Sequence, residues 1–364
     1  MMVFWPMSSL NLLPLPPQAE LETPDVMRAL VQAHRHLAEL KGVAKTIPNE
    51  GILLSTLSLQ EAQSSSAIEN IITTQDALLK HELQAGAVEP AAKEVAHYAE
   101  ALRMGYGLVK EQGNLTLNTI LNIQACLEGN RAGFRKVPGT ILRNEQTREV
   151  VFEPPLPDKV PDYMSDLERF INTEQAIDPL ICMALIHHQF ETIHPFYDGN
   201  GRTGRIINIL YLVLTRLLDV PILYLSRYIN QTRPEYYAGL QAVRKSNAWE
   251  AWVIYMLRGV SLTAQHTTTL IEKIRDLLLE QKAEIRQKHR FYSQDLINNL
   301  FRHPYTKVAF LEKDLNISRA TATRYLNALA EDGLLVKQKL GRENFYINVS
   351  LIDLLFNMPA LTID

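Results

Sequence analysis

The chain of 364 residues has 37 lysines and arginines against 40 aspartates and glutamates, a formal net charge of −3, and 46% hydrophobic residues. These values are ordinary for a soluble globular protein with room for two or three domains. The two cysteines, Cys126 and Cys182, exclude a disulfide framework and a cysteine zinc site, and both lie in apolar helical contexts that favour reduced, buried thiols.

The first 24 residues are rich in proline and lack the basic start and small-residue cleavage site of a signal peptide. We expect this segment to lie extended on the surface. The most apolar stretch, Ile206 to Leu218, is shorter than the ~20 residues of a membrane span and contains Asn208 and Arg216. The sequence therefore predicts a cytoplasmic protein that does not enter a membrane.

Helical spacing of apolar residues begins at Asp25 and continues to Leu59, which predicts one or two amphipathic helices. A further helix is expected to carry the segment SSSAIEN, in which Ser65 and Glu69 lie one turn apart. Another helix is expected near residues 91 to 111.

A second region begins near Leu117 and continues to about Gly259. Two β-rich runs, Gly139 to Leu142 and Glu149 to Glu153, flank a polar turn and predict a β-hairpin. Next, Asp178 and the proline that follows it match an N-cap and the first position of a helix. In that helix, His187 and His188 are interpreted as packing residues rather than metal ligands.

The segment HPFYDGNGRTGR, residues 194–205, precedes an apolar helix over Ile206 to Leu218. Its Asn200 and Gly201 fall at the helix start, where unpaired amides and the helix dipole favour an anion. Gly199 and Gly201 allow the backbone to approach a phosphate closely. The segment is not a P-loop, because no Gly-Lys-Ser/Thr follows at the required spacing.

The charged residues of this segment suit phosphate chemistry. His194 can accept a hydroxyl proton, and Asp198 can hold Mg²⁺ that also bridges to phosphates. Arg202 and Arg205 share one helix face and can bind successive phosphates. Phe196 is expected to anchor the loop in the core.

These twelve residues resemble the Fic signature, His-Pro-Phe-x-Asp/Glu-Gly-Asn-Gly-Arg-x-x-Arg, with every defining position filled. The resemblance implies adenylylation, in which AMP passes from ATP to a protein hydroxyl with His194 as base and Asp198 as metal ligand. Gly201 argues against the kinase-like toxin branch of the family, which has lysine there. The resemblance further implies that the nucleotide contacts are Gly199, Asn200, Gly201, Arg202, Gly204 and Arg205, together with Tyr237, which resembles part of an adenine pocket.

The upstream residues Ser65, Glu69 and Asn70 resemble the inhibitory motif of the family, Ser/Thr-x-x-x-Glu-Gly/Asn. That resemblance implies that Glu69 pairs with Arg205 and keeps ATP in an unreactive position. A carboxylate can form a bidentate pair with a guanidinium while repelling a triphosphate. In the family, the hairpin position is a flap that docks the target segment, and an exposed strand edge suits such docking.

The end of the chain resembles a winged helix. Its pattern is a short helix, a second helix capped by Ser318 and two strands around a turn at Gly341 to Asn344. A DNA-binding winged helix would present its second helix and its wing through Arg319, Thr321, Thr323, Arg324 and Asn327, and through Lys337, Lys339 and Arg342. From Phe301 to Val349 eight basic residues face five acidic ones, a net charge of only +3, so docking of DNA, docking of protein and dimerisation all stay open.

The segment between the two regions, Leu270 to His289, reads as an amphipathic connector that can also serve as a homodimer seam. We therefore expect a mainly α protein with a Fic-type helical core, a β-hairpin flap, a helical N-terminal extension and a C-terminal winged helix-turn-helix domain. The expected boundaries are 1–115 for the extension, with the inhibitory helix at about 60–75, 116–260 for the catalytic core, 261–300 for the connector and 301–364 for the winged helix.

The expected activity is that of a protein adenylyltransferase with ATP and Mg²⁺, which modifies a Tyr, Thr or Ser hydroxyl of a target protein and is inhibited by Glu69. Two alternatives remain. In one, the same site removes AMP, with Glu69 orienting the attacking water. In the other, the core senses ATP and the winged helix regulates transcription.

Overall fold

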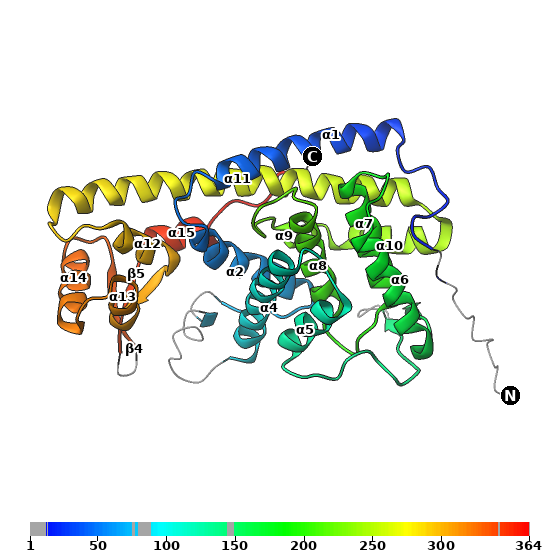
Figure 1. Cartoon of the computed structure of the whole chain (residues 1–364), viewed down its shortest axis with the longest axis horizontal. Helices are drawn as coiled ribbons and strands as arrows, with labels where there is room; N and C mark the ends of the chain where they lie inside the picture. The colour runs from blue at the N-terminus through cyan, green and yellow to red at the C-terminus, as the bar shows by residue number, and fades with distance from the viewer. Residues whose placement is uncertain are drawn as a thin grey trace. The chain divides into compact units, whose positions relative to one another are not determined.

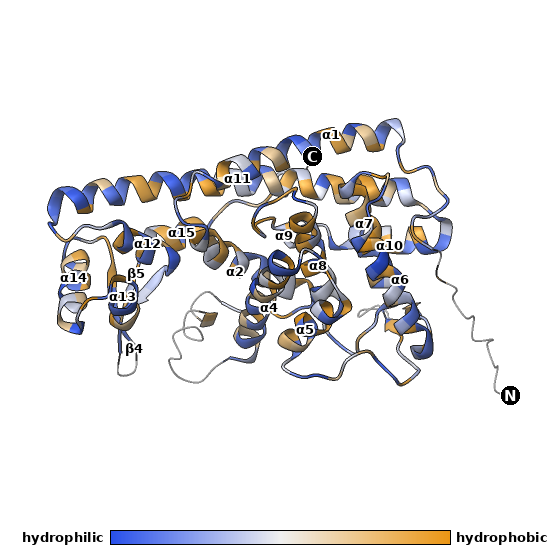
Figure 2. Ribbon diagram, in the orientation of Figure 1, coloured by the Kyte–Doolittle hydropathy of each residue, from blue (hydrophilic) through white to orange (hydrophobic). Residues whose placement is uncertain are grey.

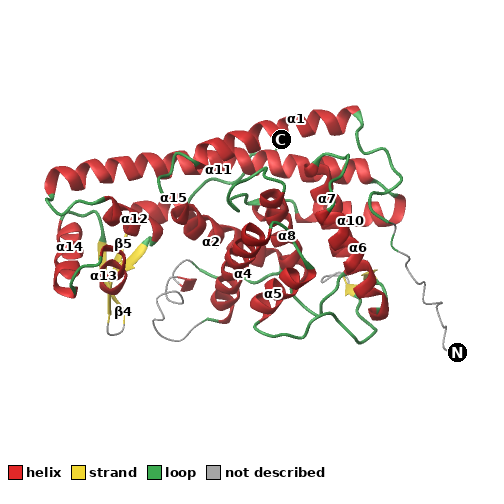
Figure 3. Cartoon of the chain, in the orientation of Figure 1, coloured by secondary structure: helices red, strands yellow, loops and turns green. Residues whose placement is uncertain are grey.

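The computed structural model describes residues 12, 14–74, 77–78, 89–143, 149–340 and 343–363. Helices dominate the described chain, and its strands form two small antiparallel sheets (Figure 1, Figure 3). The mainly α prediction is therefore confirmed. The chain divides into two compact units: the first comprises Met1–Leu30, Glu100–Arg216 and Pro234–Leu257, and the second Val31–Ala99, Leu217–Arg233 and Arg258–Asp364.

The first unit is a cluster of helices packed around α7. Its main helices are α5 (Leu117–Glu128), α6 (Val160–Asn172), α7 (Pro179–Ile193), α8 (Asn200–Leu214) and the greater part of α10 (Arg233–Ser246). Helix α7 packs against α6 and α8, and α5 packs against α6 and α8. Every residue of α7 from Leu180 to Ile193 is buried, and α8 is mostly hydrophobic (Figure 2).

The ends of α7 follow from its sequence. The Asp178 side chain caps the helix by accepting from the Leu180 amide, and Pro179 occupies the first turn, as predicted. At the other end, His194 adopts left-handed backbone angles with φ of 49° and ends the helix. Helix α7 thus delivers His194 to the loop before α8.

A short hairpin belongs to the same unit. Strand β1 (Leu142–Arg143) pairs antiparallel with β2 (Val150–Phe152). The hairpin prediction is confirmed, although the strands are shorter than the runs expected from the sequence. The polar turn between them, residues 144–148, lies outside the described residues.

The second unit contains the C-terminal part of α1 (Pro24–Ala44), α2 (Glu50–Ile68) and the first part of α4 (Pro90–Gln112), followed by α9 (Leu225–Gln231) and most of α11 (Trp249–Lys288). The predicted separate helix for SSSAIEN does not exist, because α2 continues through this segment and ends at Ile68. Helix α2 packs against α9, and against α12 (Gln294–Arg302) and α15 (Val349–Phe356) from the C-terminal region.

The C-terminal region has the element order and sheet of a winged helix. After α12 come β3 (Tyr305–Lys307), α13 (Val308–Leu315), α14 (Arg319–Glu331), β4 (Val336–Leu340) and β5 (Glu343–Ile347), with sheet order β3-β5-β4. Ser318 caps α14 by accepting from the Thr321 amide, as predicted.

The polar side chains on this winged helix are not all available to a partner. Asn327 accepts hydrogen bonds of 2.8 Å from Lys337 and from the Tyr346 hydroxyl, so it joins α14 to the wing instead of facing outward. Arg319 and Arg324 are exposed. The expected wing residue Arg342 lies outside the described residues.

Helix α11 starts 21 residues before the expected Leu270 and is one helix of 40 residues. Hydrophobic and hydrophilic residues alternate along it (Figure 2). Within the second unit, its apolar residues Leu270, Ile274, Leu278 and Ile285 are at most 1% exposed. That stripe is therefore covered by this chain itself, which leaves the expected dimer seam without a free apolar face along these four residues.

The described residues of the N-terminal segment run without helix to Pro24, and Pro17 and Leu21 in it are buried. The segment is thus only partly on the surface. Among the described residues, no helix has both the length and the apolar character needed to cross a membrane.

Candidate active site

The loop that starts at His194 is anchored through a buried aromatic ring. Phe196 is 0% exposed and lies 5.6 Å from the Phe134 ring and 6.3 Å from the Phe190 ring, measured between centroids. This confirms its predicted role as the anchor of the loop. Tyr197, the next residue, is exposed, and its hydroxyl accepts from the Lys136 amide at 2.8 Å.

Arg135 also holds this loop in place, although no pattern in the sequence singles it out. This arginine is 2% exposed, and its guanidinium donates to the carbonyl oxygens of His194 at 2.8 Å, Pro155 at 2.5 Å and Ile193 at 3.3 Å. Its own amide donates to the Pro195 carbonyl at 2.9 Å. Burial lowers the pKa of Arg135 from its ordinary value. Arg135 therefore holds the backbone on both sides of His194, the expected base.

Asn200 is committed to the loop as well. Its side-chain oxygen accepts from the Phe196 amide and its side-chain nitrogen donates to the Phe196 carbonyl, both at 2.9 Å. The side chain is buried, with 3% exposure. The backbone amides at the start of α8, rather than this side chain, are thus the groups suited to a phosphate.

Helix α8 begins without a side-chain cap. Its N-cap residue is Gly199, with φ of 75° in the left-handed region, and Gly201 lies in the first turn. The left-handed conformation favours glycine here, and a Cβ would lie 2.5 Å from Glu128 Oε1, so any other residue would also displace that carboxylate. Uncapped amides at a helix start favour an anion, as the sequence predicted.

Asp198 lies beside this helix start, and its side chain is 80% exposed. One carboxylate oxygen accepts from the Gly199 amide at 2.7 Å. Within the described residues no cluster of three or more His, Cys, Asp or Glu side chains can hold a metal. A single open carboxylate nevertheless fits Mg²⁺, which commonly takes one or two protein carboxylates with water and substrate phosphates.

The first motif arginine is paired with a glutamate that sequence reasoning missed. Arg202 is 3% exposed at its side chain and donates to Glu128 at 2.9 Å, while Asp198 lies 4.0 Å from the same nitrogen. Glu128 ends α5, 74 residues earlier in the chain, and is 15% exposed. A contact over this separation leaves no local signal in the sequence.

The second motif arginine, Arg205, is 2% exposed and lies near a buried polar cluster. His187 contacts the Tyr236 hydroxyl at 2.9 Å and the Asn208 side-chain nitrogen at 3.0 Å. Burial, and then the charge of Arg205, lowers the pKa of His187 to about 3, so the imidazole is neutral.

His188 is also buried, and burial together with Arg244 lowers its pKa to about 3. It packs edge-on against Trp249 with ring centroids 4.8 Å apart. Both histidines are thus packing residues, as predicted. Gly204 has a packing role too, because an added Cβ would lie 2.9 Å from Glu191 and 3.0 Å from Phe190 on α7.

Tyr236 and Tyr237 lie one turn into α10 and differ in exposure. Tyr236 is 2% exposed, whereas Tyr237 is 47% exposed, and their rings meet edge-on at 5.2 Å. An exposed ring on a buried neighbour can stack on a base. The assignment of Tyr237 to the adenine stays a prediction.

The expected inhibitory residues lie in the second unit at the C-terminal end of α2. Ser65 is 0% exposed within the helix, whereas Glu69 is the C-cap and is exposed. The two residues therefore do not share an exposed helix face. The helix ends at Ile68 and not near residue 75 as expected.

Asn70 explains where the helix ends. Its φ is 59°, its amide donates to Ala67, and the Ile71 amide donates to Ser66, both at 3.0 Å. These two bonds form a Schellman motif, which needs a left-handed residue at this position. Glycine and asparagine adopt that conformation most readily, which accounts for the Gly/Asn choice after the glutamate.

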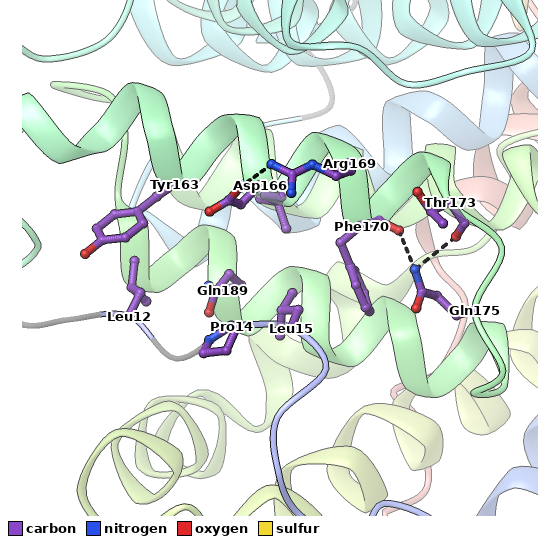
Figure 4. Close-up of a pocket in the computed structure, with 11 residues that line it drawn as sticks. Leu12, Pro14, Leu15, Tyr163, Asp166, Arg169, Phe170, Thr173, Gln175 and Gln189 are labelled. Atoms are coloured by element: carbon purple, nitrogen blue, oxygen red, sulfur yellow. Dashed lines mark hydrogen bonds and ion pairs between the residues drawn. The ribbon is translucent and has the colours of Figure 1, made fainter.

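A cavity of about 360 Å³ lies elsewhere in the first unit, between the N-terminal segment and α6 (Figure 4). Its walls combine the apolar Leu15 and Phe170 with polar groups such as Gln175, whose amide donates to the carbonyls of Phe170 and Thr173. None of the residues that line it belongs to the segment from His194 to Arg205. The cavity is separate from the candidate active site.

In this mainly helical chain, a histidine, an acidic residue, glycines and two arginines lie in the loop before α8 and in the first turns of that helix. Three family models match it in succession: the Fic/DOC family N-terminal model over residues 27–107, the Fic/DOC family model over 114–212, and the protein adenylyltransferase SoFic-like C-terminal domain over 277–351. The chain belongs to the Fic/DOC family.

Curated proteins that match part of this chain are named protein adenylyltransferases. The chain is 30% identical over 168 residues to protein adenylyltransferase fic-1 of Caenorhabditis briggsae, which covers 43% of this chain and 31% of that protein. It is 36% identical over 94 residues to a probable protein adenylyltransferase of Aquifex aeolicus, covering 26% of this chain and 29% of that protein. The chain thus spans less than a third of the length of these relatives.

Solved structures support the fold. A Fic family protein from Desulfovibrio desulfuricans G20 aligns with a TM-score of 0.55 at 20% identity, covering 90% of this chain and 96% of that one. A Fic domain containing signaling protein from Bacteroides thetaiotaomicron aligns with a TM-score of 0.56 at 19% identity, covering 67% and 97% respectively. At these identities the likeness concerns the fold alone.

Proposed function

We propose that this protein is an adenylyltransferase that moves AMP from ATP to a side-chain hydroxyl of a target protein. The observation that supports it best is the arrangement at the start of α8, where His194 precedes an uncapped helix N-terminus that also carries Arg202 and Arg205. A base, an anion site and two buried guanidiniums are the groups that transfer of a nucleotide requires.

In the proposed reaction the His194 imidazole takes the proton of a target Tyr, Thr or Ser hydroxyl. The hydroxyl oxygen then forms a bond to the α-phosphorus of ATP, and the bond from that phosphorus to the bridging oxygen of pyrophosphate breaks. The amides of Gly201 and Arg202 stabilise charge on the α-phosphate, and the guanidiniums of Arg202 and Arg205 neutralise the departing pyrophosphate. The imidazolium returns its proton to solvent.

Asp198 would hold Mg²⁺, because its carboxylate is open to solvent beside the anion site. When bound with ATP, this ion neutralises phosphate charge. Tyr237 would stack on the adenine from its exposed position on α10.

We also propose that Glu69 restrains the transfer, since a carboxylate competes with a phosphate for a guanidinium of the motif. The relatives named adenylyltransferases and the SoFic-like match support the proposed transfer of AMP. Removal of AMP by the same site would respond in the opposite way, because Glu69 would then serve the reaction.

The test uses the full chain as wild type, Glu69→Gly and the double variant Glu69→Gly/His194→Ala, each incubated with Mg²⁺ and α-labelled ATP. We expect the single variant to gain the mass of AMP by modifying its own chain and the double variant to lose that gain by at least ~100-fold in rate, the effect of removing a general base. Equal labelling of both variants would overturn the role of His194. No labelling of any of them would overturn the transferase assignment.

A further inference from the structure

The carboxylate of Glu69 lies in an electrostatically unfavourable position at the C-terminal end of α2. The carbonyl ends of a helix carry partial negative charge, so a carboxylate at the C-cap is destabilising there, and cations are favoured. Helix α2 has no basic residue in its last turn. The position of Glu69 therefore depends on a cation supplied from another part of the chain.

Arg233 supplies that cation within the second unit. Its guanidinium donates to the Ala67 carbonyl at 2.5 Å and to the Asn70 side-chain oxygen at 3.2 Å. These two acceptors flank Glu69 on either side. One arginine thus bonds both the last turn of the helix and the left-handed residue that ends it.

The guanidinium is itself oriented. Asn230, near the end of α9, accepts from its Nε at 2.8 Å and from one terminal nitrogen at 2.6 Å. Because Asn230 holds one edge of the planar guanidinium, the other N–H groups of Arg233 point in a fixed direction. A lysine ammonium cannot be oriented in this way. The α9 helix also packs along α2, and there Glu61 accepts from the Ser226 amide at 3.2 Å and from the Tyr98 hydroxyl at 3.1 Å.

Glu61 and Arg233 hold different parts of α2 and differ in burial. Glu61 is 2% exposed and anchors the middle of the helix, so its removal would disturb the core. Arg233 is half-buried and acts only on the last turn, where helix ends open most easily. Of the two, Arg233 is the group whose loss would release Glu69 without unfolding the unit.

We propose that Arg233 is the positioning residue for inhibition: by clamping Ala67 and Asn70 it keeps the Glu69 carboxylate in its inhibitory place. This inference rests on the proposed function and adds to it the group on which the restraint depends. Arg233 is also the first residue of α10, one turn before Tyr236 and Tyr237. The arginine that bonds the end of α2 therefore starts the same helix whose Tyr237 is proposed to contact the adenine.

The experiment measures the rate of self-labelling by the full chain in wild type, Glu69→Gly, Arg233→Ala, Arg233→Lys and Glu69→Gly/Arg233→Ala. We expect Arg233→Ala to label about tenfold faster than wild type, because charge-assisted bonds to the last turn are lost. Arg233→Lys keeps the charge without the fork and should fall between the two. In the double variant the rate should equal that of Glu69→Gly, since Arg233 acts through Glu69.

Arg227→Ala is the matched control. Arg227 lies on α9, shortly before Arg233 in sequence, and also donates to carbonyls, but to those of Met358 and Pro359 at 3.0 and 2.7 Å. It should label like wild type. Thermal unfolding of each variant verifies that the fold is kept.

The outcomes separate the two proposals. If Glu69→Gly labels strongly and Arg233→Ala labels like wild type, the clamp is overturned while the adenylyltransferase stands. The clamp is equally overturned if Arg233→Ala lowers labelling in both backgrounds, because that is the response of a purely structural residue. If Glu69→Gly does not label at all, the proposed function fails and the clamp fails with it.

Discussion

The catalytic loop of the first unit and the α2 terminus of the second are held by different means. The loop is fixed by buried groups: Arg135 bonds its backbone, Asn200 bonds Phe196 twice, and Phe196 is fully enclosed. The α2 terminus leaves Glu69 and Asn70 exposed and is clamped by the half-buried Arg233. Under the proposed function, the reacting groups would thus lie in a rigid part of the molecule, whereas Glu69, the proposed restraint, would lie in a part that is easier to release.

The largest effect is expected from a substitution that loosens the loop that starts at His194. Arg135→Ala would leave the carbonyls of His194, Pro155 and Ile193 without their donor in a buried place. Because each buried, unsatisfied group costs about 1–3 kcal/mol, we expect the free energy of unfolding to fall by on the order of 3 kcal/mol or more, measured by urea denaturation.

Arg135→Lys serves as the control, since it keeps the charge and one donor and should lose less stability. In the Glu69→Gly background, Arg135→Ala should also abolish self-labelling. An unchanged urea midpoint would show that the loop does not depend on this arginine.

Acid is expected to destabilise the first unit through two buried histidines. The pKa values of His187 and His188 are lowered by burial from 6.5 to about 3 in the folded chain. Between these values the unfolded chain binds protons that the folded chain does not, so stability is fully present above about pH 6.5 and falls as the pH drops toward 3. At pH 5 each histidine should cost roughly 2 kcal/mol of unfolding free energy.

The measurement compares urea midpoints of wild type and His187→Gln at pH 8 and pH 5. The variant should lose less stability on acidification than wild type, because glutamine does not titrate. Equal acid losses in the two proteins would contradict the buried neutral state of His187.

A smaller effect is expected at the phosphate site itself. Glu128 pairs with Arg202 at 2.9 Å and thereby competes with a phosphate for the same guanidinium. In the Glu69→Gly background, Glu128→Gln should lower the KM for ATP about fivefold, the order expected when a partly exposed charge pair of about 1 kcal/mol is removed.

The control is Glu168→Gln, which changes a glutamate of the same unit that instead accepts from the Leu117 amide at 2.8 Å. It should leave the KM for ATP unchanged. A rise of the KM in Glu128→Gln would mean that the pair positions Arg202 for the nucleotide and does not compete with it.

The local features of this molecule could be predicted from the sequence. Caps such as Asp178 and Ser318, the helix start after Gly199 and the packing role of Phe196 each depend on neighbours a few residues away. The end of α2 was missed, although Asn70 could have indicated it, because the apolar spacing continues past Ile68 and hides a left-handed stop.

The supports of the site could not be predicted. Arg135 reaches a carbonyl 59 residues away, Glu128 an arginine 74 residues away and Arg233 a carbonyl 166 residues away. Such contacts depend on how the helices pack, and no spacing in one sequence encodes them. The motif therefore predicts the reacting groups, whereas the residues proposed to fix and restrain them emerge only from the tertiary structure.

The smallest expected effect tests the left-handed turn at the α2 terminus. Asn70 has φ of 59°, so alanine there should cost about 1 kcal/mol locally, whereas glycine accepts the conformation and loses only the bond from Arg233. Hydrogen exchange of the Ile71 amide, which closes the turn onto Ser66, reports this directly. Exchange should be faster in Asn70→Ala than in Asn70→Gly, and self-labelling should rise in the same order. Neither variant has the side-chain oxygen that accepts from Arg233, so the two differ only in how well they adopt the left-handed backbone, and equal or reversed exchange rates would mean that this turn does not hold Glu69 in place.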